Sequence, residues 1–542
     1  MLLRNWLLLV LLCSSLCLVA QDKGAFSGAL QTSVNYFIKD AAIGAINIPQ
    51  YDQGLIGVDT WLNLSYSFKG YNAGVRLDYF KNSNLLIPTA AYSDQGLGKA
   101  FINKRFDKLY VELGYVYGQI GSGIIFRAYE ERPLLIDNAL VGVKARYDIT
   151  DNWSASGFVG RQKNQFSLNE GLIKGGSIEG FYATGSDDAP LSFSPGIGLV
   201  NRTHSQQTVD RLVNIVKQYI GDERIGLKYN TYLTSIYNSL NYQDLTLYIE
   251  YAYKSAEAFR DPISTRTELT GQQTFGKFVN EPGSVLYTSL NFGDAKLGVT
   301  VELKRTQNFN FKSDPTLTGA MGLVGFLPPM SRENTYRLTS RYTPTTQDLS
   351  ERAIQTEIRY RHNKKLSALA NFARITDLKD ELLYREYFLQ FQYKQKRKWL
   401  LTAGIQSVNY NQEVFEVKPN VPLVKTITPF AEFLYRFTNK RSLKTEIQYL
   451  NTDEDLGSWV YGLAEVGLAP HWLFELSGMY NIDPAKGGDK IFYPTLGAVY
   501  NYKTHRVGIR YVKQVEGIVC AGGICRLEPA FSGARFTLNS TF

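Results

Sequence analysis

Charged side chains recur on one phase of a period-two alternation that runs through this chain. They are Arg76, Asp78, Glu250, Lys254, Glu302, Lys304, Arg337, Arg341, Glu357, Arg359, Arg361, Lys444, Glu446, Arg506 and Arg510. Charges of both signs lie on neighbouring stretches, which predicts ion pairs across strands and a hydrated interior. The alternative is a conduit in which a basic belt from Arg337 to Arg361 favours anionic solutes.

Histidine is the other candidate for chemistry, and the chain has four: His204, His362, His471 and His505. A hydrolytic site needs a nucleophile, a base and a third group that orients the base. The run Thr203-His204-Ser205 supplies a serine beside a histidine, which is a commonplace pair. We therefore expect no enzymatic activity and no catalytic residue. The alternative is a hydrolase that uses His204.

Two acidic runs, Asp187-Asp188 and Asp453-Glu454-Asp455, could offer oxygen ligands to a divalent cation. Solvated loop carboxylates are much commoner than ion sites. We therefore expect no metal and no cofactor.

Four cysteines are present, and Cys13 and Cys17 belong to an apolar N-terminal run. Cys520 and Cys525 close a turn that contains Gly522-Gly523. In an exported protein this arrangement predicts a disulfide. Two thiols are too few for a structural zinc site.

The N-terminal run has the features of a secretory signal. Arg4 precedes the apolar stretch from Trp6 to Val19, and Ala20 then meets polar Gln21. This pattern predicts a signal peptide over residues 1–20 and a mature chain over residues 21–542. After Ala20 no stretch reaches the roughly 18–20 apolar residues that a spanning helix needs.

The rest of the chain alternates polar and apolar residues, as in Leu62 to Phe68 and Leu245 to Tyr253. This period is typical of strands, and the runs fit the ~9–11 residues of a tilted strand that crosses a bilayer. A mean hydropathy of −0.20 is compatible with such strands, because lipid-facing and lumen-facing residues average out. The 36 Tyr and 30 Phe suit strands and interfacial girdles. The rival interpretation is a secreted sandwich of stacked sheets.

Connections alternate between short turns, such as Lys69-Gly70 and Gln243-Asp244, and longer loops, such as Glu257 to Pro282. Barrels place short turns in the periplasm and long loops outside. The alternation holds throughout only if Gly322 to Pro328 forms one more strand. We therefore predict an all-β, single up-and-down transmembrane barrel of about 26 strands, with 24 next, periplasmic termini and long extracellular loops.

A barrel of this size must be filled or covered, because 16–18 strands already leave an aqueous channel. The candidates are inward folding of Thr203 to Asp222 or of Asn308 to Ser331, the long Glu257 to Pro282 loop, a flattened cross-section, or a partner protein. Within the first, Thr208 to Ile220 has helical spacing, with a loop carrying a strand edge as the alternative.

A net charge of +9 is spread along the chain without a long basic run, which argues against nucleic-acid binding.

The chain end carries a family resemblance. Its alternating strand to Phe542 resembles the C-terminal signal of bacterial outer-membrane β-barrels, which the barrel-assembly machinery reads before this strand pairs with the first. The segment Cys520 to Gly533, the Ala20-Gln21 junction and the opening Phe26-Ser27-Gly28 resemble a Bacteroidota outer-membrane barrel family of uncharacterised function. The resemblance implies a fold and a compartment, the bacterial cell outer membrane, and no catalytic or binding residue.

The sequence thus predicts a non-enzymatic integral outer-membrane protein, either a component of a larger envelope assembly or a gated porin-like channel. The alternatives are an outer-membrane hydrolase with an extracellular-face site and a surface adhesin or receptor that uses its extracellular loops. Expected partners are outer-membrane lipid, the barrel-assembly machinery during biogenesis and a lumen-filling or capping protein.

Overall fold

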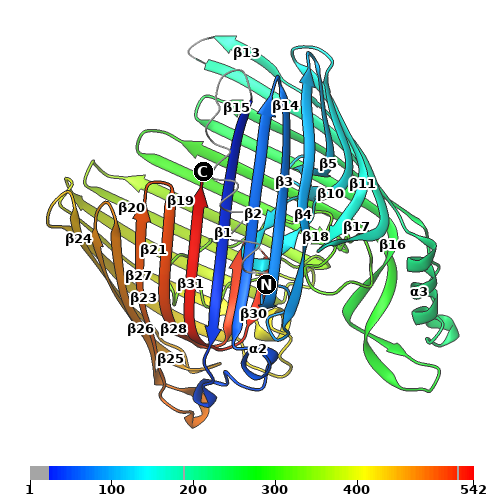
Figure 1. Cartoon of the computed structure of the whole chain (residues 1–542). Coiled ribbons are helices and arrows are strands. Elements are labelled where there is room, and N and C mark those ends of the chain that lie inside the picture. The colour runs from blue at the N-terminus through cyan, green and yellow to red at the C-terminus, as the bar shows by residue number, and fades with distance from the viewer. Residues whose placement is uncertain (1–23, 187–188, 522–523) are drawn as a thin grey trace, which may run out of the picture.

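The computed structural model describes residues 24–186, 189–521 and 524–542, and its main feature is one antiparallel sheet of 25 strands. Strand β13 pairs with β14 alone, and the other 24 strands of that sheet close into a barrel (Figure 1). Barrel strands that follow one another along the chain are neighbours. The prediction of a single up-and-down all-β barrel is confirmed.

The strands that close the barrel are β1 (Ala25–Phe37), β2 (Ile56–Phe68), β3 (Tyr71–Ser83), β4 (Tyr92–Phe106), β5 (Leu109–Val116), β10 (Leu140–Asp148), β11 (Trp153–Asn164), β12 (Ser167–Gly180), β14 (Ala189–Thr203), β15 (Asn230–Tyr242), β16 (Leu245–Thr267), β17 (Gln273–Gly293), β18 (Leu297–Gln307), β19 (Ser350–Arg361), β20 (Leu366–Thr376), β21 (Leu382–Gln395), β22 (Trp399–Tyr410), β23 (Val424–Arg436), β24 (Arg441–Leu450), β25 (Ser458–Leu468), β26 (Trp472–Asp483), β27 (Phe492–Tyr502), β28 (His505–Gln514) and β31 (Phe531–Thr541).

The remaining elements lie in the connections. The short strands are β6 (Gly118–Gln119), β7 (Arg127–Ala128), β8 (Glu130–Glu131), β9 (Ile136–Asp137), β13 (Tyr182–Ser186), β29 (Gly517–Ala521) and β30 (Ile524–Glu528). The helices are η2 (Ala41–Ile43), α2 (Pro49–Asp52), η3 (Arg132–Leu134), α3 (Gln206–Val216), η4 (Gly221–Glu223), α4 (Gln412–Phe415) and η5 (Ala485–Gly487). Within the described ranges, no helix combines the length and apolar character of a membrane span.

The barrel closes where β31 pairs with β1, from Ala29–Thr541 to Phe37–Gly533. Beyond that register, Gly28 and Phe542 exchange backbone hydrogen bonds of 2.8 and 2.9 Å. The expected pairing of the last strand with the first is therefore confirmed. Closure matters because a free sheet edge in lipid would leave backbone N–H and C=O groups without partners.

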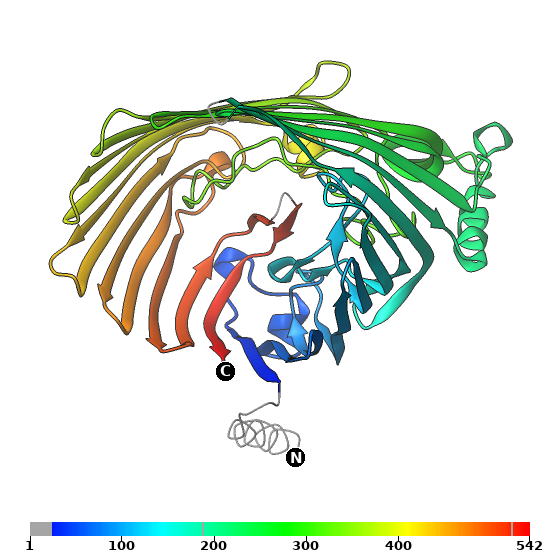
Figure 2. The same cartoon turned by 90° about the horizontal axis from the view of Figure 1, so that it is seen from above.

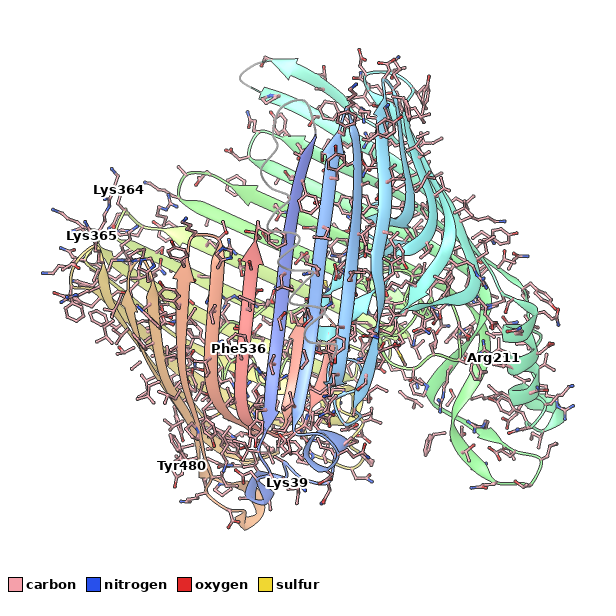
Figure 3. The ribbon with its side chains drawn as sticks, viewed as in Figure 1. Lys39, Arg211, Lys364, Lys365, Tyr480 and Phe536 are labelled. Atoms are coloured by element: carbon pink, nitrogen blue, oxygen red, sulfur yellow. The ribbon has the colours of Figure 1, made fainter. Side chains whose placement is uncertain are left out.

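The two faces of the wall differ in polarity, as the alternation predicts. On β16, Tyr251 and Tyr253 are exposed on the outer face, whereas Ala252 and Lys254, which alternate with them, are buried on the inner side. Phe536 of β31 and Tyr480 of β26 belong to the same outer face (Figure 3). The outer surface is therefore suited to hydrocarbon, and the inner surface carries the polar groups.

Most short turns lie at one end of the barrel, and the long connections lie at the other (Figure 1). The two-residue turn between β11 and β12, residues 165–166, is an exception at the long-loop end. Lys69 and Gly70 both have positive φ, 47° and 77°, as a two-residue type I′ turn requires. By the rule for outer-membrane barrels, the short-turn end faces the periplasm and the long-loop end faces outward. The N-terminal end of β1 and the C-terminal end of β31 both lie at the short-turn end.

The strand count corrects one prediction. The higher count of about 26 required a strand at Gly322 to Pro328, which is wrong, and the alternative of 24 matches the barrel. Gly322 to Pro328 instead belongs to a long connection between β18 and β19 without strand structure of its own. Pro328 and Pro329 lack the N–H groups that a strand ladder needs.

Two further segments differ from expectation. Most of Glu257 to Pro282, expected as a long loop that could fill or cover the lumen, extends the β16–β17 hairpin beyond the barrel end, and the turn itself is only residues 268–272. The helical pattern at Thr208 to Ile220 is confirmed as α3, which Ser205 caps by accepting from the Thr208 N–H. However, α3 lies outside the ring of strands (Figures 1 and 2), so this helix, one of the candidates for filling the lumen, does not fold into it. It packs instead against Phe278 of the hairpin, through Leu212 and Val216.

Candidate functional site: the occupied lumen

The barrel interior contains a long irregular connection, residues 308–349, which we call the inner segment. It lies inside the ring of strands, and the ring itself has a flattened outline (Figure 2). Its side chains Phe309, Phe311, Val324, Leu338 and Tyr342 are buried in one apolar cluster with side chains of the barrel wall. The predicted inward folding of Asn308 to Ser331 is therefore confirmed.

The wall donates hydrogen bonds to backbone carbonyl groups of the inner segment. The donors are Gln162 Nε2 to Leu323 O (2.7 Å), Lys254 Nζ to Asn310 O (2.8 Å), Lys304 Nζ to Pro328 O (2.5 Å), Arg202 Nη1 to Lys312 O (2.5 Å) and Gln406 Nε2 to Thr339 O (3.0 Å). A buried segment without regular structure must find partners for its backbone, and these long side chains supply them. They come from strands at widely separated positions in the wall, so the segment is held at several points.

Two kinds of interaction hold the inner segment. Each fully buried large apolar side chain contributes roughly 1.5–3 kcal/mol relative to exposure to water. A neutral hydrogen bond, such as those from Gln162 and Gln406, adds a net of about 0.5–1.5 kcal/mol, whereas one from a charged donor such as Lys254, Lys304 or Arg202 adds roughly 1.5–3 kcal/mol. Apolar burial and the hydrogen bonds of the charged donors therefore contribute similarly per group, and the directed hydrogen bonds also determine which path the segment follows.

A buried ionic cluster supports the carbonyl contacts. Glu257 Oε2 lies 2.5 Å from Arg202 Nη2, and Glu257 Oε1 lies 2.8 Å from Lys254 Nζ. All three side chains are buried, with exposures of 3% or less. The single carboxylate pairs with both cations and offsets one of their two positive charges, while other N–H groups of the two cations bind carbonyl groups of the inner segment.

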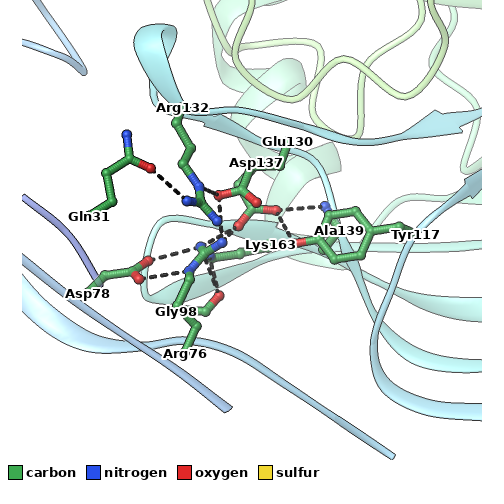
Figure 4. A network of polar contacts seen from close by, with 10 residues as sticks. All are labelled: Gln31, Arg76, Asp78, Gly98, Tyr117, Glu130, Arg132, Asp137, Ala139 and Lys163. Atoms are coloured by element: carbon green, nitrogen blue, oxygen red, sulfur yellow. Dashed lines mark hydrogen bonds and ion pairs between the residues drawn. The ribbon is translucent and has the colours of Figure 1, made fainter. Parts of the chain in front are cut away.

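A second inward connection, residues 117–139, is tied to the wall through a polar network (Figure 4). Arg76 on β3 contacts Asp78 (2.7 Å) on its own strand, and Glu130 (2.5 Å) and Asp137 (2.9 Å) on the connection. Lys163 on β11 also binds Asp137, at 2.6 Å. Arg76 is thus the centre at which wall and connection meet.

Charges in this network balance. Arg132 joins it by donating to Glu130 Oε1 (2.9 Å) and to Gln31 Oε1 (2.8 Å). Burial by itself would raise the pKa of Asp137, but Lys163 and Arg76 hold that pKa below its usual value. Three cations thereby face three carboxylates, so the connection is docked without a net charge inside the barrel.

The two inward connections also contact each other. Arg127 N donates to Val324 O (2.8 Å), and Phe326 N donates to Gly123 O (2.9 Å). The Arg127 guanidinium lies 4.1 Å from the ring centroid of Phe326. A small cavity of about 280 Å³ between them is lined by Ile124 and by phenylalanines of the inner segment. The lumen therefore contains one joined assembly of two connections.

The predicted lumen charges fall into two groups. Arg76, Asp78, Glu250, Lys254, Glu302, Lys304, Glu357, Arg359, Arg361, Lys444, Glu446, Arg506 and Arg510 lie on barrel strands in the phase opposite to the exposed apolar residues. Arg337 and Arg341 lie on the inner segment, so their expected position on the alternating wall is wrong although they are inside the barrel. The basic belt considered from Arg337 to Arg361 is therefore not one stretch of wall. Arg337 and Arg341 lie on the inner segment, whereas Arg359 and Arg361 lie on β19.

Ion pairing among these charges is partly as predicted. Arg510 Nε lies 3.1 Å from Glu475 of β26, and Lys304 Nζ lies 2.8 Å from Glu351 of β19. Several predicted charges instead bind the inward connections, as Arg76 and Lys254 do. The sequence pattern identified the phase of the wall but not these partners.

His204, the histidine singled out for hydrolysis, is buried and its Nδ1 has no hydrogen-bond partner within the described residues. Burial, assisted by nearby Arg202, lowers the pKa of His204 to about 3. With a pKa this low, the His204 imidazole is a weak proton acceptor, and within the described residues its Nδ1 lacks the orienting partner that the base of a catalytic triad has.

The candidate metal ligands are also accounted for as far as the structure describes them. Asp455 accepts from Tyr342 Oη (3.0 Å) and pairs with Arg341 (3.4 Å), both on the inner segment. Asp187-Asp188 lies outside the described residues. Among the residues that are described, no group of three or more His, Cys, Asp or Glu side chains is placed to hold a metal ion.

Cys520 and Cys525 are register partners in the β29–β30 hairpin. Their side chains lie outside the described ones, as does the predicted signal peptide, residues 1–20. The disulfide and the signal peptide therefore stay predictions.

Several residues of the site were missed at the level of sequence. Arg202, Gln162 and Gln406 lie on the inward phase of their strands, so the alternation could have placed them in the lumen. Glu386 of β21 follows the same phase and accepts from Asn334 of the inner segment (3.0 Å). Nothing in the spacing indicates that these side chains bind a connection distant in sequence.

A closed barrel with an apolar outer face and a polar, occupied interior defines an integral protein of the bacterial outer membrane. The chain belongs to the "Family of unknown function (DUF6029)", whose model matches residues 2–542. The expected membership of an uncharacterised barrel family is thus confirmed, while the Bacteroidota origin stays a prediction.

Comparisons with other known proteins give weak likenesses. No curated protein matches. Among solved structures, the siderophore receptor PirA from Pseudomonas aeruginosa aligns with 9% identity and a TM-score of 0.37, covering 97% of this chain and 81% of that one. The P pilus usher (PapC) translocation pore aligns with 7% identity and a TM-score of 0.42, covering 95% and 99%. PirA from Acinetobacter baumannii aligns with 7% identity and a TM-score of 0.40, covering 97% and 81%.

Proposed function

We propose that this protein is a non-enzymatic, porin-like channel whose lumen is gated by its own inner segment. The observation that carries the proposal is the way residues 308–349 occupy the interior while bonded to the wall through side chains. Such bonds can be released one by one without breaking a strand ladder. A channel that can be closed also meets the requirement that a 24-strand barrel must not breach the outer membrane.

Deletion of the inner segment tests this proposal. Gln307 and Ser350 are register partners at the ends of β18 and β19, so an Asn-Gly turn can replace residues 308–349 without straining the barrel. In planar bilayers, the full chain should be closed or open rarely, and the deletion variant should conduct steadily. A folded deletion variant that stays silent, or a full chain that is always open, would contradict gating by this segment.

A second candidate function, membership of a larger envelope assembly, rests on a separate observation. The β16–β17 hairpin extends beyond the long-loop end and, with α3, forms a projection outside the barrel (Figure 1). Ile263, Leu269 and Phe275 at its end are 73%, 66% and 71% exposed, which exceeds the exposure of most lipid-facing side chains. Apolar groups that are this exposed beyond the barrel end are suited to contact a partner protein.

Shortening that hairpin tests the assembly function and provides a matched control for the first experiment. Phe259 and Val279 are register partners, so residues 260–278 can be replaced by an Asn-Gly turn. A partner that co-purifies with the full chain in mild detergent should be lost from this variant and kept by the inner-segment deletion. The inner-segment deletion should conduct steadily, whereas the variant with the shortened hairpin should stay closed like the full chain. Migration of the full chain as a lone species would count against the assembly.

A further inference from the structure

At the short-turn end, one cavity of the inner wall has a strong excess of positive charge. It measures about 770 Å³ and lies between β18 and β21. Six cationic side chains line it together with a single carboxylate, Asp294: Lys296, Arg359, Arg361, Lys364, Lys365 and Lys394. Of these, Arg359, Arg361 and Lys394 lie on the inward phase of their strands, so the cavity opens on the lumen side. Lys364 and Lys365 lie at the rim (Figure 3).

These cations are available for a ligand. Arg359 is 72% exposed and has one ion pair, with Glu357 at 2.6 Å. Within the described part of the chain, the other five cations have no carboxylate within 4.0 Å, because no ion pair includes them. Gln390 and Gln392 line the same cavity and add neutral hydrogen-bonding groups. Apart from the Arg359–Glu357 pair, the site thus offers cationic N–H donors that no described carboxylate pairs with.

A neighbouring cavity shows that this excess is local. The cavity along β10 to β16 at the same end is similar in size, about 830 Å³, but its lining mixes Lys108 and Arg146 with Asp107, Asp148, Asp151 and Glu179. There Arg146 pairs with Asp148 at 3.3 Å. Positive charge is therefore concentrated on one side of the short-turn end. Lys396, Arg397 and Lys398, in the turn between β21 and β22, add to the positive electrostatic potential there.

We propose that the cavity between β18 and β21 binds multiply charged anions that carry phosphate or carboxylate groups. Arginine recognises both groups through paired N–H donors, and lysine contributes a point charge. This inference rests on the proposed channel function for one point, the role of the bound anion, which would be a solute captured at the periplasmic mouth of the channel. Binding itself is measurable whether or not the barrel conducts.

Calorimetric titration with inorganic tripolyphosphate tests the site. The full chain, in zwitterionic detergent at low ionic strength, is compared with Arg359→Gln/Arg361→Gln/Lys394→Gln. The matched control is Lys396→Gln/Arg397→Gln/Lys398→Gln, which removes the same charge from the adjoining turn outside the cavity. An exposed ion pair contributes a factor of about 1.4 to 5, so the cavity variant should bind roughly tenfold more weakly. The control should change affinity by less than about threefold. Resistance of the folded band to SDS confirms that each variant is folded.

Native mass spectrometry distinguishes a soluble anion from a lipid headgroup. Each protein is purified in micelles with and without phosphatidylglycerol, and retained lipid is counted. Lipid retention that the cavity variant loses and the control keeps supports the site with a headgroup as the source of the phosphate. Absence of both tripolyphosphate binding and lipid retention in the full chain overturns the proposal. Equal losses in the cavity variant and the control also overturn it, because they indicate a diffuse field and no site.

Discussion

Gly28 and Phe542 exchange two backbone hydrogen bonds and form the outermost pair of the seam that closes the barrel. The Phe542 ring lies over the Gly28 Cα, so that a Cβ at position 28 would overlap it. Glycine therefore gives the terminal aromatic its place against the first strand. The contact between Gly28 and Phe542 therefore links the last residue of the chain to the seam that closes the barrel.

We expect Gly28→Val to weaken the seam by displacing the Phe542 ring. The variant should close more slowly during refolding into detergent, and less of it should resist SDS without heating. Gly293→Val is the matched control, because a Cβ there meets nothing within 4 Å. Equal refolding of the two variants would contradict a role for this contact.

Arg76→Gln should destabilise the barrel strongly. The substitution leaves Asp78, Glu130 and Asp137 without their common buried partner, and breaking such a pair costs about 3–5 kcal/mol. Arg105→Gln removes the exposed pair with Asp148 and should cost only about 0–1 kcal/mol. The free energy of unfolding in urea, measured in lipid vesicles, compares the two. Similar values for both variants would mean that the network does not dock the 117–139 connection.

Gly325→Val should separate the two inward connections. A Cβ at Gly325 would collide with the Ile124 carbonyl oxygen, so the backbones can approach only because glycine is present. Single-channel recording should detect more frequent openings than in the full chain. Gly221→Ala, at a position with free space outside the barrel, should leave opening frequency unchanged.

His204 should add a pH dependence to stability. Its pKa is about 3 in the folded protein and about 6.5 in an unfolded chain, so the unfolded chain binds the extra proton between these values. The contribution to the free energy of unfolding is therefore complete above pH ~6.5 and is lost as the pH falls toward 3. Between pH 7 and pH 5 the loss should be roughly 1–2 kcal/mol, and His204→Asn should remove it. His362→Asn, at an exposed position, is the control for urea titrations at the two pH values.

The β29–β30 hairpin should carry a disulfide. Directly opposed residues of an antiparallel pair have Cα atoms about 4.5–5.5 Å apart, within the range that a disulfide bridges. Mass spectrometry of the unreduced mature protein should find no free thiol at Cys520 or Cys525. Alkylation of both without prior reduction would refute the bond.

The alternation of side chains was enough to predict the wall. Residues such as Tyr251 and Lys254 point to opposite faces because the strand period is two, and a closed sheet is the stable way to place such strands in lipid. The helical spacing of Val209 and Leu212 likewise predicted α3. These features depend on interactions between residues close in sequence or on the solvent on each side, so a single sequence contains them.

The path of the inner segment was decided only by the tertiary structure. Gly322 to Pro328 resembled one more strand, yet its carbonyl groups bind Gln162 and Lys304, far away along the chain. Glu257 likewise pairs with Arg202 across strands, and neither residue carries a local signal of the other. Such contacts depend on which strands the closed barrel brings around the lumen, and sequence spacing does not encode that geometry. The sequence therefore determined the polarity of each face, whereas the tertiary structure determined what occupies the space within.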